Sequence, residues 1–309
     1  MINRTIIRVK IVQLMYAYYQ NGGKNIDTAE KELLFSLSKA YDLYNYLLLL
    51  MVEVTRYASE VVLKKEQLNK IAHKDEVVSH RFIDNQFIAQ LSINKALNEY
   101  KETQKKSWDS EHAYVKALYE DIVQSEDYQQ YMAAESVSYE DDRTLWRHIY
   151  KHFIMSDTRL DEVLEGLSLY WNDDKETVDT FVIKTIKRFD PNNGAKQELL
   201  PEYRSEEDRE FATKLFRRSI LNDEVYRNLV ARNLRNWEMN RLAYMDLIIL
   251  QVAVAEMLSF PLIPVSVTVN EYVEIAKLYS TPRSGSYITA VLYNLANQLT
   301  KEGKLMKKA

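Results

Sequence analysis

Residues 256–292 read EMLSFPLIPVSVTVNEYVEIAKLYSTPRSGSYITAVL, and this stretch decides the fold class. Its segment Val265–Val269 alternates like a β-strand, but it has only five residues. The apolar positions that continue to Tyr279 recur at helical spacing, so we expect one helix over 266–280. Thr281-Pro282 then predicts another helix over 282–301, with threonine as its cap and proline at its first position.

Further helices are expected outward from this stretch, at 206–221, 223–235 and 241–259. We expect them to form one bundle with the first two helices of the chain. The residues expected in its core are Leu242, Met245, Ile249, Val252, Ala253, Val269, Ala276 and Leu292.

The composition supports an all-α protein. Only 6 Gly and 5 Pro occur in 309 residues, which leaves few places for the turns between strands. The longest apolar runs, Tyr46–Val52 and Leu247–Ala255, are much shorter than the roughly 20 residues of a membrane span. Because the chain also starts without a recognisable signal peptide, we expect a cytoplasmic protein that does not enter a membrane.

The amino-terminal half is expected to be helical as well. One helix is predicted over 3–20 and ends at Gly22-Gly23. A second, opened by Asp27 and Glu30, extends to Ile71 with a break near Lys64-Lys65. Four or five helices are expected in 80–190, one of which is opened by Asp173 and Glu176, before turn residues at 190–205 mark a boundary.

The chemistry of the side chains gives no catalytic site. The chain has no cysteine, which excludes thiolate catalysis and disulfides. His148 and His152 have the spacing of a zinc-protease motif, but Ile149 occupies the position of its catalytic glutamate, so we expect no metal. No glycine-rich phosphate loop is present, so we expect no cofactor and no enzyme. The acidic stretch 109–146 is interpreted as a solvated face.

Basic side chains favour binding to RNA instead. Arg4 and Arg8 share a face of the first helix, and arginine suits phosphate because its planar group donates two parallel hydrogen bonds. The net charge of −4 does not exclude this, because a local patch decides such binding. The other basic candidates are Lys10, Lys214, Arg217, Arg218, Arg227, Arg232, Arg235, Arg241, Lys301, Lys304, Lys307 and Lys308.

The last hundred residues resemble the NusB family of bacterial transcription antitermination factors. The matching segments are Glu256-Met-Leu, Ile263-Pro264-Val265, Asn270–Lys277 and Tyr287–Leu292, in the order and spacing of the family. The first helix is also similar, with basic residues followed by Val12-Gln13-Leu14-Met15-Tyr16. Thr289-Ala290 departs from the family's Asn-Gly, and Arg283 stands where the family often has an acidic residue.

The resemblance implies a NusB-like helical bundle with an additional inserted helical layer. It divides the chain into amino-terminal bundle helices at 1–64, an inserted region of unknown role at 65–204, and carboxy-terminal bundle helices at 205–309. It also implies a non-enzymatic factor that binds single-stranded boxA-like RNA of ribosomal-RNA leader transcripts. The partners that it implies are the ribosomal protein NusE and the RNA polymerase antitermination complex.

The resemblance also assigns site residues by position. Arg4, Arg8, Arg283 and Tyr287 fall on the RNA side, where three guanidinium groups are expected to cluster beside a stacking ring. Tyr16 and Asp246 fall where the protein partner docks. Two alternatives remain open: an RNA-binding accessory module of an rRNA-modification or ribosome-assembly system, and a helical scaffold for protein interactions.

Overall fold

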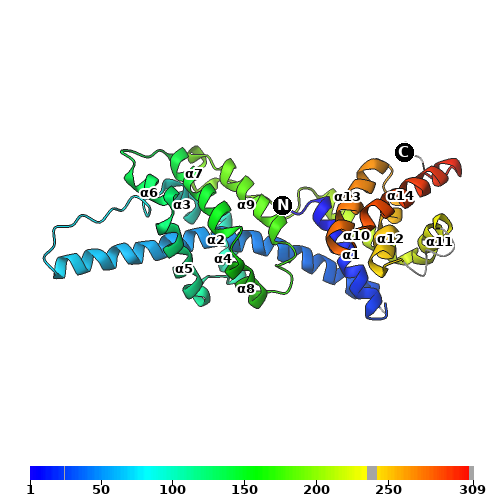
Figure 1. Ribbon diagram of the computed structural model, residues 1–309, viewed down its shortest axis with the longest axis horizontal. Helices are drawn as coiled ribbons and strands as arrows, with labels where there is room; N and C mark the ends of the chain where they lie inside the picture. Colours follow the sequence, from blue (N-terminus) through cyan, green and yellow to red (C-terminus); the bar gives the residue numbers. More distant parts are fainter. Residues whose placement is uncertain (24, 235–241, 306–309) are drawn as a thin grey trace. The chain divides into compact units, whose positions relative to one another are not determined.

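The structure is a computed structural model that describes residues 1–23, 25–234 and 242–305 (Figure 1). Its regular elements are helices, and within these ranges the only β-pairing is one isolated parallel bridge between Ile2 and Tyr203. The predicted all-α class is thus confirmed. No helix in the described ranges is both long and apolar enough to cross a membrane. The basic candidates Arg235, Arg241, Lys307 and Lys308 lie outside the described residues.

Contacts divide the chain into two units. Unit 1 comprises Lys39–Glu202 together with Met1, and unit 2 comprises Ile2–Ser38 together with Tyr203–Ala309. The boundary at Ser38 falls inside a helix, earlier than the division at residue 64 drawn from the sequence, because the side chains that follow Ser38 pack among the middle helices.

Unit 2 is a bundle built around one apolar helix, α12 (Tyr244–Ser259). Its side chains are buried almost all round, because five helices contact it. The contacting helices are α1 (Arg4–Gln20), α10 (Glu206–Leu221), α11 (Asp223–Asn233), α13 (Val265–Tyr279) and α14 (Ser284–Lys301). Figure 1 shows α1 among α10, α12 and α13, far from it in sequence.

Most of the predicted core of unit 2 is confirmed. The buried residues among those expected are Ile249, Val252, Ala253, Val269, Ala276 and Leu292. Leu242 and Met245 are only half-buried, so their assignment to the core was wrong. Leu242 precedes α12 and Met245 lies in its first turn, where fewer helices surround the chain.

At two helix starts the structure has an opening residue other than the predicted one. The helix α14 begins at Ser284 rather than at Pro282, because the Ser284 hydroxyl bonds the Thr281 hydroxyl at 2.8 Å and accepts from the Thr281 amide. The helix α2 (Ile26–Ile71) is opened by Asn25, whose Oδ1 accepts from the amides of Asp27 and Thr28 at 3.0 Å. The predicted Asp27 cap was therefore wrong.

The helix α2 has no break near Lys64-Lys65, contrary to the prediction. All 46 residues from Ile26 to Ile71 are helical. No glycine or proline occurs in this range, so nothing in the sequence interrupts the backbone hydrogen bonds. One helix therefore belongs to unit 2 up to Ser38 and to unit 1 beyond it.

Unit 1 packs aromatic side chains against this second part of α2. The Tyr46 ring stacks on Trp108 and Trp171, with centroids 4.2 and 5.2 Å apart. The indole nitrogens of the two tryptophans donate to the carbonyls of Tyr46 and Lys39, both at 2.9 Å. These contacts attach the middle of the chain to α2.

Seven α-helices lie between residues 86 and 188, more than the four or five predicted. Side-chain caps divide the region more finely, since Asn85, Asn94, Ser125 and Ser138 each accept from a helix amide. The helices are α3 (Gln86–Ser92), α4 (Lys95–Gln104), α5 (His112–Gln124), α6 (Glu126–Ala133), α7 (Tyr139–Ile149), α8 (Thr158–Leu167) and α9 (Lys175–Arg188), joined by short helices at Asp109–Glu111, Tyr150–Ile154 and Pro191–Lys196.

Candidate functional site

An open polar pocket of about 580 Å³ lies in unit 2, at the start of α1. It is formed by the first turn of α1, the residues that lead into α10, and the turn between α12 and α13. Arginine and carboxylate side chains dominate its lining. The lining residues are Asn3, Arg4, Thr5, Arg8, Arg204, Ser205, Glu207, Asp208, Leu262, Ile263, Pro264, Val267 and Glu271.

The Asn3 side chain fixes the start of α1 at this pocket. Its Oδ1 accepts a hydrogen bond from the Ile6 amide at 3.0 Å, as a helix cap does. Because Arg4 and Arg8 are one turn apart on this helix, they reach the same pocket, as their spacing predicts.

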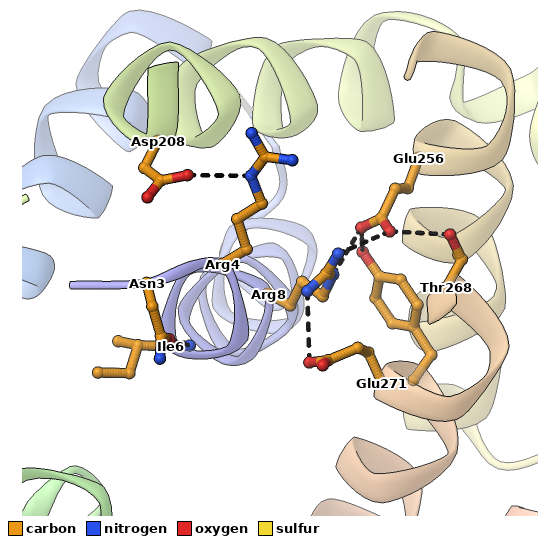
Figure 2. Close-up of polar contacts among 9 residues, drawn as sticks. Asn3, Arg4, Ile6, Arg8, Asp208, Glu256, Thr268 and Glu271 are labelled. Atoms are coloured by element: carbon orange, nitrogen blue, oxygen red, sulfur yellow. Dashed lines mark hydrogen bonds and ion pairs between the residues drawn. The ribbon is translucent and has the colours of Figure 1, made fainter. Parts of the chain in front are cut away.

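Arg8 lines the pocket, and Figure 2 shows its guanidinium group between Glu256 and Glu271. Its Nε and Nη2 donate to Glu256 Oε2 and Oε1 at 2.7 and 2.9 Å, so the pair is joined at two points. Only 3% of the Arg8 side chain and none of the Glu256 side chain is exposed. Arg8 Nη1 also lies 3.3 Å from Glu271 Oε2. The guanidinium group is therefore already engaged by two carboxylates.

Two hydroxyl groups complete the bonding of Glu256. Thr268 donates to its Oε1 at 2.9 Å and Tyr272 donates to its Oε2 at 3.0 Å. Burial of the phenol and the nearby charge of Glu256 raise the pKa of Tyr272 well above its ordinary value, so the hydroxyl stays a donor. Burial alone would lower the pKa of Arg8, but the hydrogen bonds and charge of Glu256 outweigh it and raise that pKa.

Arg4 is more accessible than Arg8. Its Nε donates to Asp208 Oδ1 at 2.9 Å, and 38% of its side chain is exposed. Its guanidinium carbon lies 5.0 Å from the centre of the Phe211 ring, on which Arg8 also rests at 5.4 Å. Its two terminal nitrogens form no hydrogen bond with a residue in the described ranges, which leaves a second donor edge for a ligand (Figure 2).

Sequence reasoning missed Arg204 as a pocket residue. Arg204 is exposed and lines the pocket two residues before α10 begins. The preceding residue, Tyr203, forms the β-bridge with Ile2, which carries Arg204 to the start of α1. Nothing in the local sequence marks this pairing, because the bridged residues are about 200 positions apart in the chain.

Arg283 and Tyr287 do not line this pocket. Arg283 is exposed directly before α14, and Tyr287 is half-buried one turn further on. Ser284 donates to Asp246 Oδ2 at 2.8 Å, which places the start of α14 beside the first turn of α12. Glu256, which holds Arg8, is about 15 Å further along α12, at 1.5 Å per residue. The four expected RNA residues thus form two pairs near opposite ends of α12, rather than one cluster.

The two expected partner residues lie near the Arg283 end. Tyr16 is 37% exposed, and its ring meets the edge of Tyr244 at a centroid distance of 5.7 Å. Asp246 is only 5% exposed, and its Oδ1 is buried without a hydrogen-bond partner among the described residues. Tyr16 is thus accessible to a partner. Asp246 is buried and accepts the hydrogen bond from Ser284 that joins α12 to the start of α14.

The histidine pair has other contacts. His148 Nδ1 lies 3.3 Å from Asp127 Oδ1, and the rings of His148 and His152 meet edge-on. Within the described ranges no group of three or more His, Cys, Asp or Glu side chains is arranged to hold a metal ion.

Unit 2 is by these observations a compact helical domain with an arginine-lined pocket at the start of its first helix. Comparison with known proteins shows that the NusB family matches residues 183–297, which include α10 to α13 and most of α14. The chain belongs to the NusB family.

Three curated relatives, each named transcription antitermination protein NusB, illustrate the match. The protein from Salinibacter ruber is 38% identical over 99 residues, which are 32% of this chain and 62% of the relative. That from Koribacter versatilis is 38% identical over 99 residues, covering 32% and 68%. That from Bacillus cereus is 38% identical over 94 residues, covering 30% and 72%.

The likeness is thus confined to part of each protein. About two thirds of this chain lies outside the segments that match these relatives, and the match covers less than two thirds of the Salinibacter protein. No solved structure matches the chain.

Proposed function

We propose that this protein is an RNA-binding transcription antitermination factor that acts by binding and not by catalysis. The observation that carries the proposal is its membership of a family whose curated members bear that name. The arginine-lined pocket supports it, because guanidinium groups bind the phosphates of nucleic acid.

The RNA that we propose is a single-stranded boxA-like element of ribosomal-RNA leader transcripts. We further propose that the protein binds it together with the ribosomal protein NusE, within the RNA polymerase antitermination complex. On this proposal Arg4 and Arg283 contact phosphates, since both have accessible side chains. Tyr287 stacks on an unpaired base, which requires its half-buried ring to face the RNA on one side.

Arg8 has a different part in this proposal. Its guanidinium group is held by Glu256 and Glu271, so a phosphate could reach it only by competing with two carboxylates. We propose that Arg8 fixes the start of α1 in the bundle and thereby holds Arg4 at the pocket. Tyr16 is proposed to touch the protein partner directly, and Asp246 to support that surface from beneath.

Affinity for RNA tests this proposal. The full chain is titrated with a labelled boxA-like RNA and with a shuffled RNA of the same composition, with and without NusE, at two salt concentrations. We expect tighter binding to the boxA-like RNA and a fall of log K with log salt of about 0.7 per phosphate contacted. No binding to either RNA in either setting would refute the proposal.

Single substitutions then separate the proposed roles. Arg4→Ala and Arg283→Ala should each lower the salt slope and weaken both RNAs, whereas Tyr287→Ala should cost about 1–3 kcal/mol of stacking with the slope unchanged. Arg209→Ala is the matched control, because Arg209 is exposed on α10 but does not line the pocket. If Arg209→Ala weakens RNA binding as much as the other substitutions, the assigned surface is wrong.

Termination assays test the cellular role. RNA polymerase transcribes a template with a boxA-like sequence upstream of a terminator, in the presence of the protein and NusE. We expect more read-through than with a template whose boxA-like sequence is shuffled. Equal read-through on the two templates would contradict antitermination while leaving RNA binding in place.

A further inference from the structure

Four of the six charged side chains that line the α1 pocket are already paired with each other. Arg4 is bonded to Asp208, and Arg8 is bonded to Glu271 as well as to Glu256 beneath it. The two remaining charged residues, Arg204 and Glu207, form no ion pair with any residue in the described ranges. Both are exposed at the entrance to α10.

We infer that Arg204 is a second phosphate-contacting residue of the pocket, which acts together with the outer edge of Arg4 on one phosphodiester group of the RNA. The inference rests on the proposed RNA-binding function and adds a residue that the family resemblance does not assign. An exposed guanidinium without a carboxylate partner is the group most available to an incoming anion, because no existing ion pair has to be broken.

The backbone holds Arg204 at this place. Tyr203 is paired with Ile2 in a parallel bridge, so the residues that follow each of them, Asn3 and Arg204, enter the pocket side by side. The bridge at Ile2 and the Asn3 cap are consecutive, and together they fix the backbone that carries the Arg4 and Arg204 side chains. A phosphate can therefore bind between these two arginines with movement of their side chains alone.

The pocket also has an apolar side suited to a nucleotide. Leu262 is 94% exposed and Val267 is 40% exposed, and both line the pocket beside Pro264. A single-stranded chain can rest an unpaired base on this surface while its phosphate meets Arg4 and Arg204, an arrangement that a duplex does not offer because its bases are paired and stacked. The inference thus specifies single-stranded RNA for this pocket.

Glu207 provides a second test of the inference, because its carboxylate repels an anion in the same pocket as Arg204. Its unpaired carboxylate lines the pocket in the first turn of α10 and repels phosphate. Removing this charge should therefore strengthen RNA binding, the opposite direction to removing Arg204.

The test compares the salt dependence of RNA affinity for the full chain and four variants: Arg204→Ala, Arg204→Lys, Glu207→Gln and the control Arg209→Ala. Arg209 is exposed on α10 and does not line the pocket, and its Nη1 lies 3.8 Å from Glu206 Oε1. Arg209→Ala therefore removes the same charge as Arg204→Ala at a site outside the pocket. The probe is a boxA-like single-stranded RNA, with the same sequence in duplex form as the comparison.

Arg204→Ala should weaken single-strand binding about tenfold at low salt and lower the salt slope by about 0.7, while Arg204→Lys retains most of the slope. Glu207→Gln should tighten binding, and Arg209→Ala should change it little. Thermal melting of each variant should match the parent, since the side chains of Arg204, Glu207 and Arg209 are all exposed.

Two results would overturn the inference but leave the proposed function standing. One is unchanged affinity and slope in Arg204→Ala and Glu207→Gln, while the parent still binds RNA. The other is an equal loss in Arg204→Ala and Arg209→Ala, which would show only a general effect of net charge. A parent protein that binds no RNA would remove the inference together with the proposed function.

Discussion

Arg8 and Glu256 are joined by two parallel hydrogen bonds of 2.7 and 2.9 Å, and both side chains are almost completely buried. They lie 248 positions apart in the chain, on α1 and in the last turn of α12. The pair ties the start of α1 to the centre of the bundle. Each charge depends on the other, because an ionised group without a partner is costly inside a protein.

Replacing Arg8 with alanine should therefore destabilise unit 2 strongly. The buried Glu256 carboxylate would keep only the hydroxyls of Thr268 and Tyr272, and breaking a buried pair costs about 3–5 kcal/mol. Arg4→Ala removes a partly exposed pair and should cost about 1 kcal/mol or less. Urea unfolding measures both, and similar costs for the two variants would contradict the assignment of Arg8 as the structural member.

A second prediction concerns the buried Lys175 in unit 1. Its Nζ donates to the Met155 carbonyl at 2.7 Å, next to the short π-helix Tyr150–Ile154, and to Asp179 Oδ2 at 3.2 Å. Lys175→Met should destabilise unit 1, because the carbonyl and the buried carboxylate both lose a donor. Lys187→Met, on the exposed face of the same helix, is the control.

The cost of Lys175→Met should also depend on pH. Burial raises the pKa of Asp179, although the hydrogen bond from Tyr150 and the charge of Lys175 act in the opposite direction. A carboxyl group whose folded pKa is raised stabilises the fold below its ordinary pKa of 3.8, and this stabilisation is lost as pH rises through the folded pKa. Without Lys175 the pKa of Asp179 rises further, so the variant should lose more stability at pH 7 than at pH 4. A loss that is equal at the two pH values would contradict this account.

A third prediction concerns His80, whose Nε2 lies 2.7 Å from Glu66 Oε1 on α2. The hydrogen bond and charge of Glu66 raise the pKa of His80 above its ordinary value of 6.5. The contact therefore stabilises the segment after α2 fully below pH 6.5, and the stabilisation is lost as pH rises through the folded pKa. Nuclear magnetic resonance titration of the imidazole should show the raised pKa, and Glu66→Gln should return it to about 6.5. A pKa that Glu66→Gln leaves unchanged would show that another group causes the shift.

A fourth prediction separates the two proposed partner residues. Tyr16→Ala removes an accessible ring and should weaken binding to NusE without a large change in melting temperature. Asp246→Ala removes the acceptor of the Ser284 hydroxyl and should lower the melting temperature first. Binding to NusE, measured at a temperature where both variants are folded, shows whether each side chain contacts the partner directly. If Asp246→Ala melts like the parent and Tyr16→Ala binds like the parent, the assignment of both residues fails.

The sequence predicted the helices of unit 2 well, because their apolar positions and turn residues are local signals. Four of the five helices after residue 205 begin within two residues of the predicted position, at Glu206, Asp223, Val265 and Ser284. The start of α14 was missed by two positions, since it depends on which hydroxyl bonds the Thr281 side chain. Local sequence patterns predict that a helix exists, whereas the side-chain hydrogen bonds at its amino-terminal end determine its first residue.

The site could be predicted only in part. The spacing of Arg4 and Arg8 predicted a shared helix face, and both residues line one pocket. The spacing could not show that Arg8 is buried, because its partner Glu256 lies 248 positions away. The same limitation applies to Arg204, which reaches the pocket through a single bridge between distant segments. Residues that meet only through the tertiary fold have no signature in a short stretch of sequence.

Because unit 2 is formed by two separate stretches of the chain, it cannot fold completely until late in its synthesis. Ile2–Ser38 leaves the ribosome first, but α10, α12 and α13, which cover α1, all follow residue 205. At about 5–20 residues per second, the intervening residues 39–202 take roughly 8–30 s to translate. Throughout this interval the apolar face of α1, with Ile7, Ile11 and Val12, has none of these three helices to pack on. The pocket is therefore completed late in synthesis, and a nascent chain that stops before α13 carries Arg4 and Arg8 without the walls that hold them.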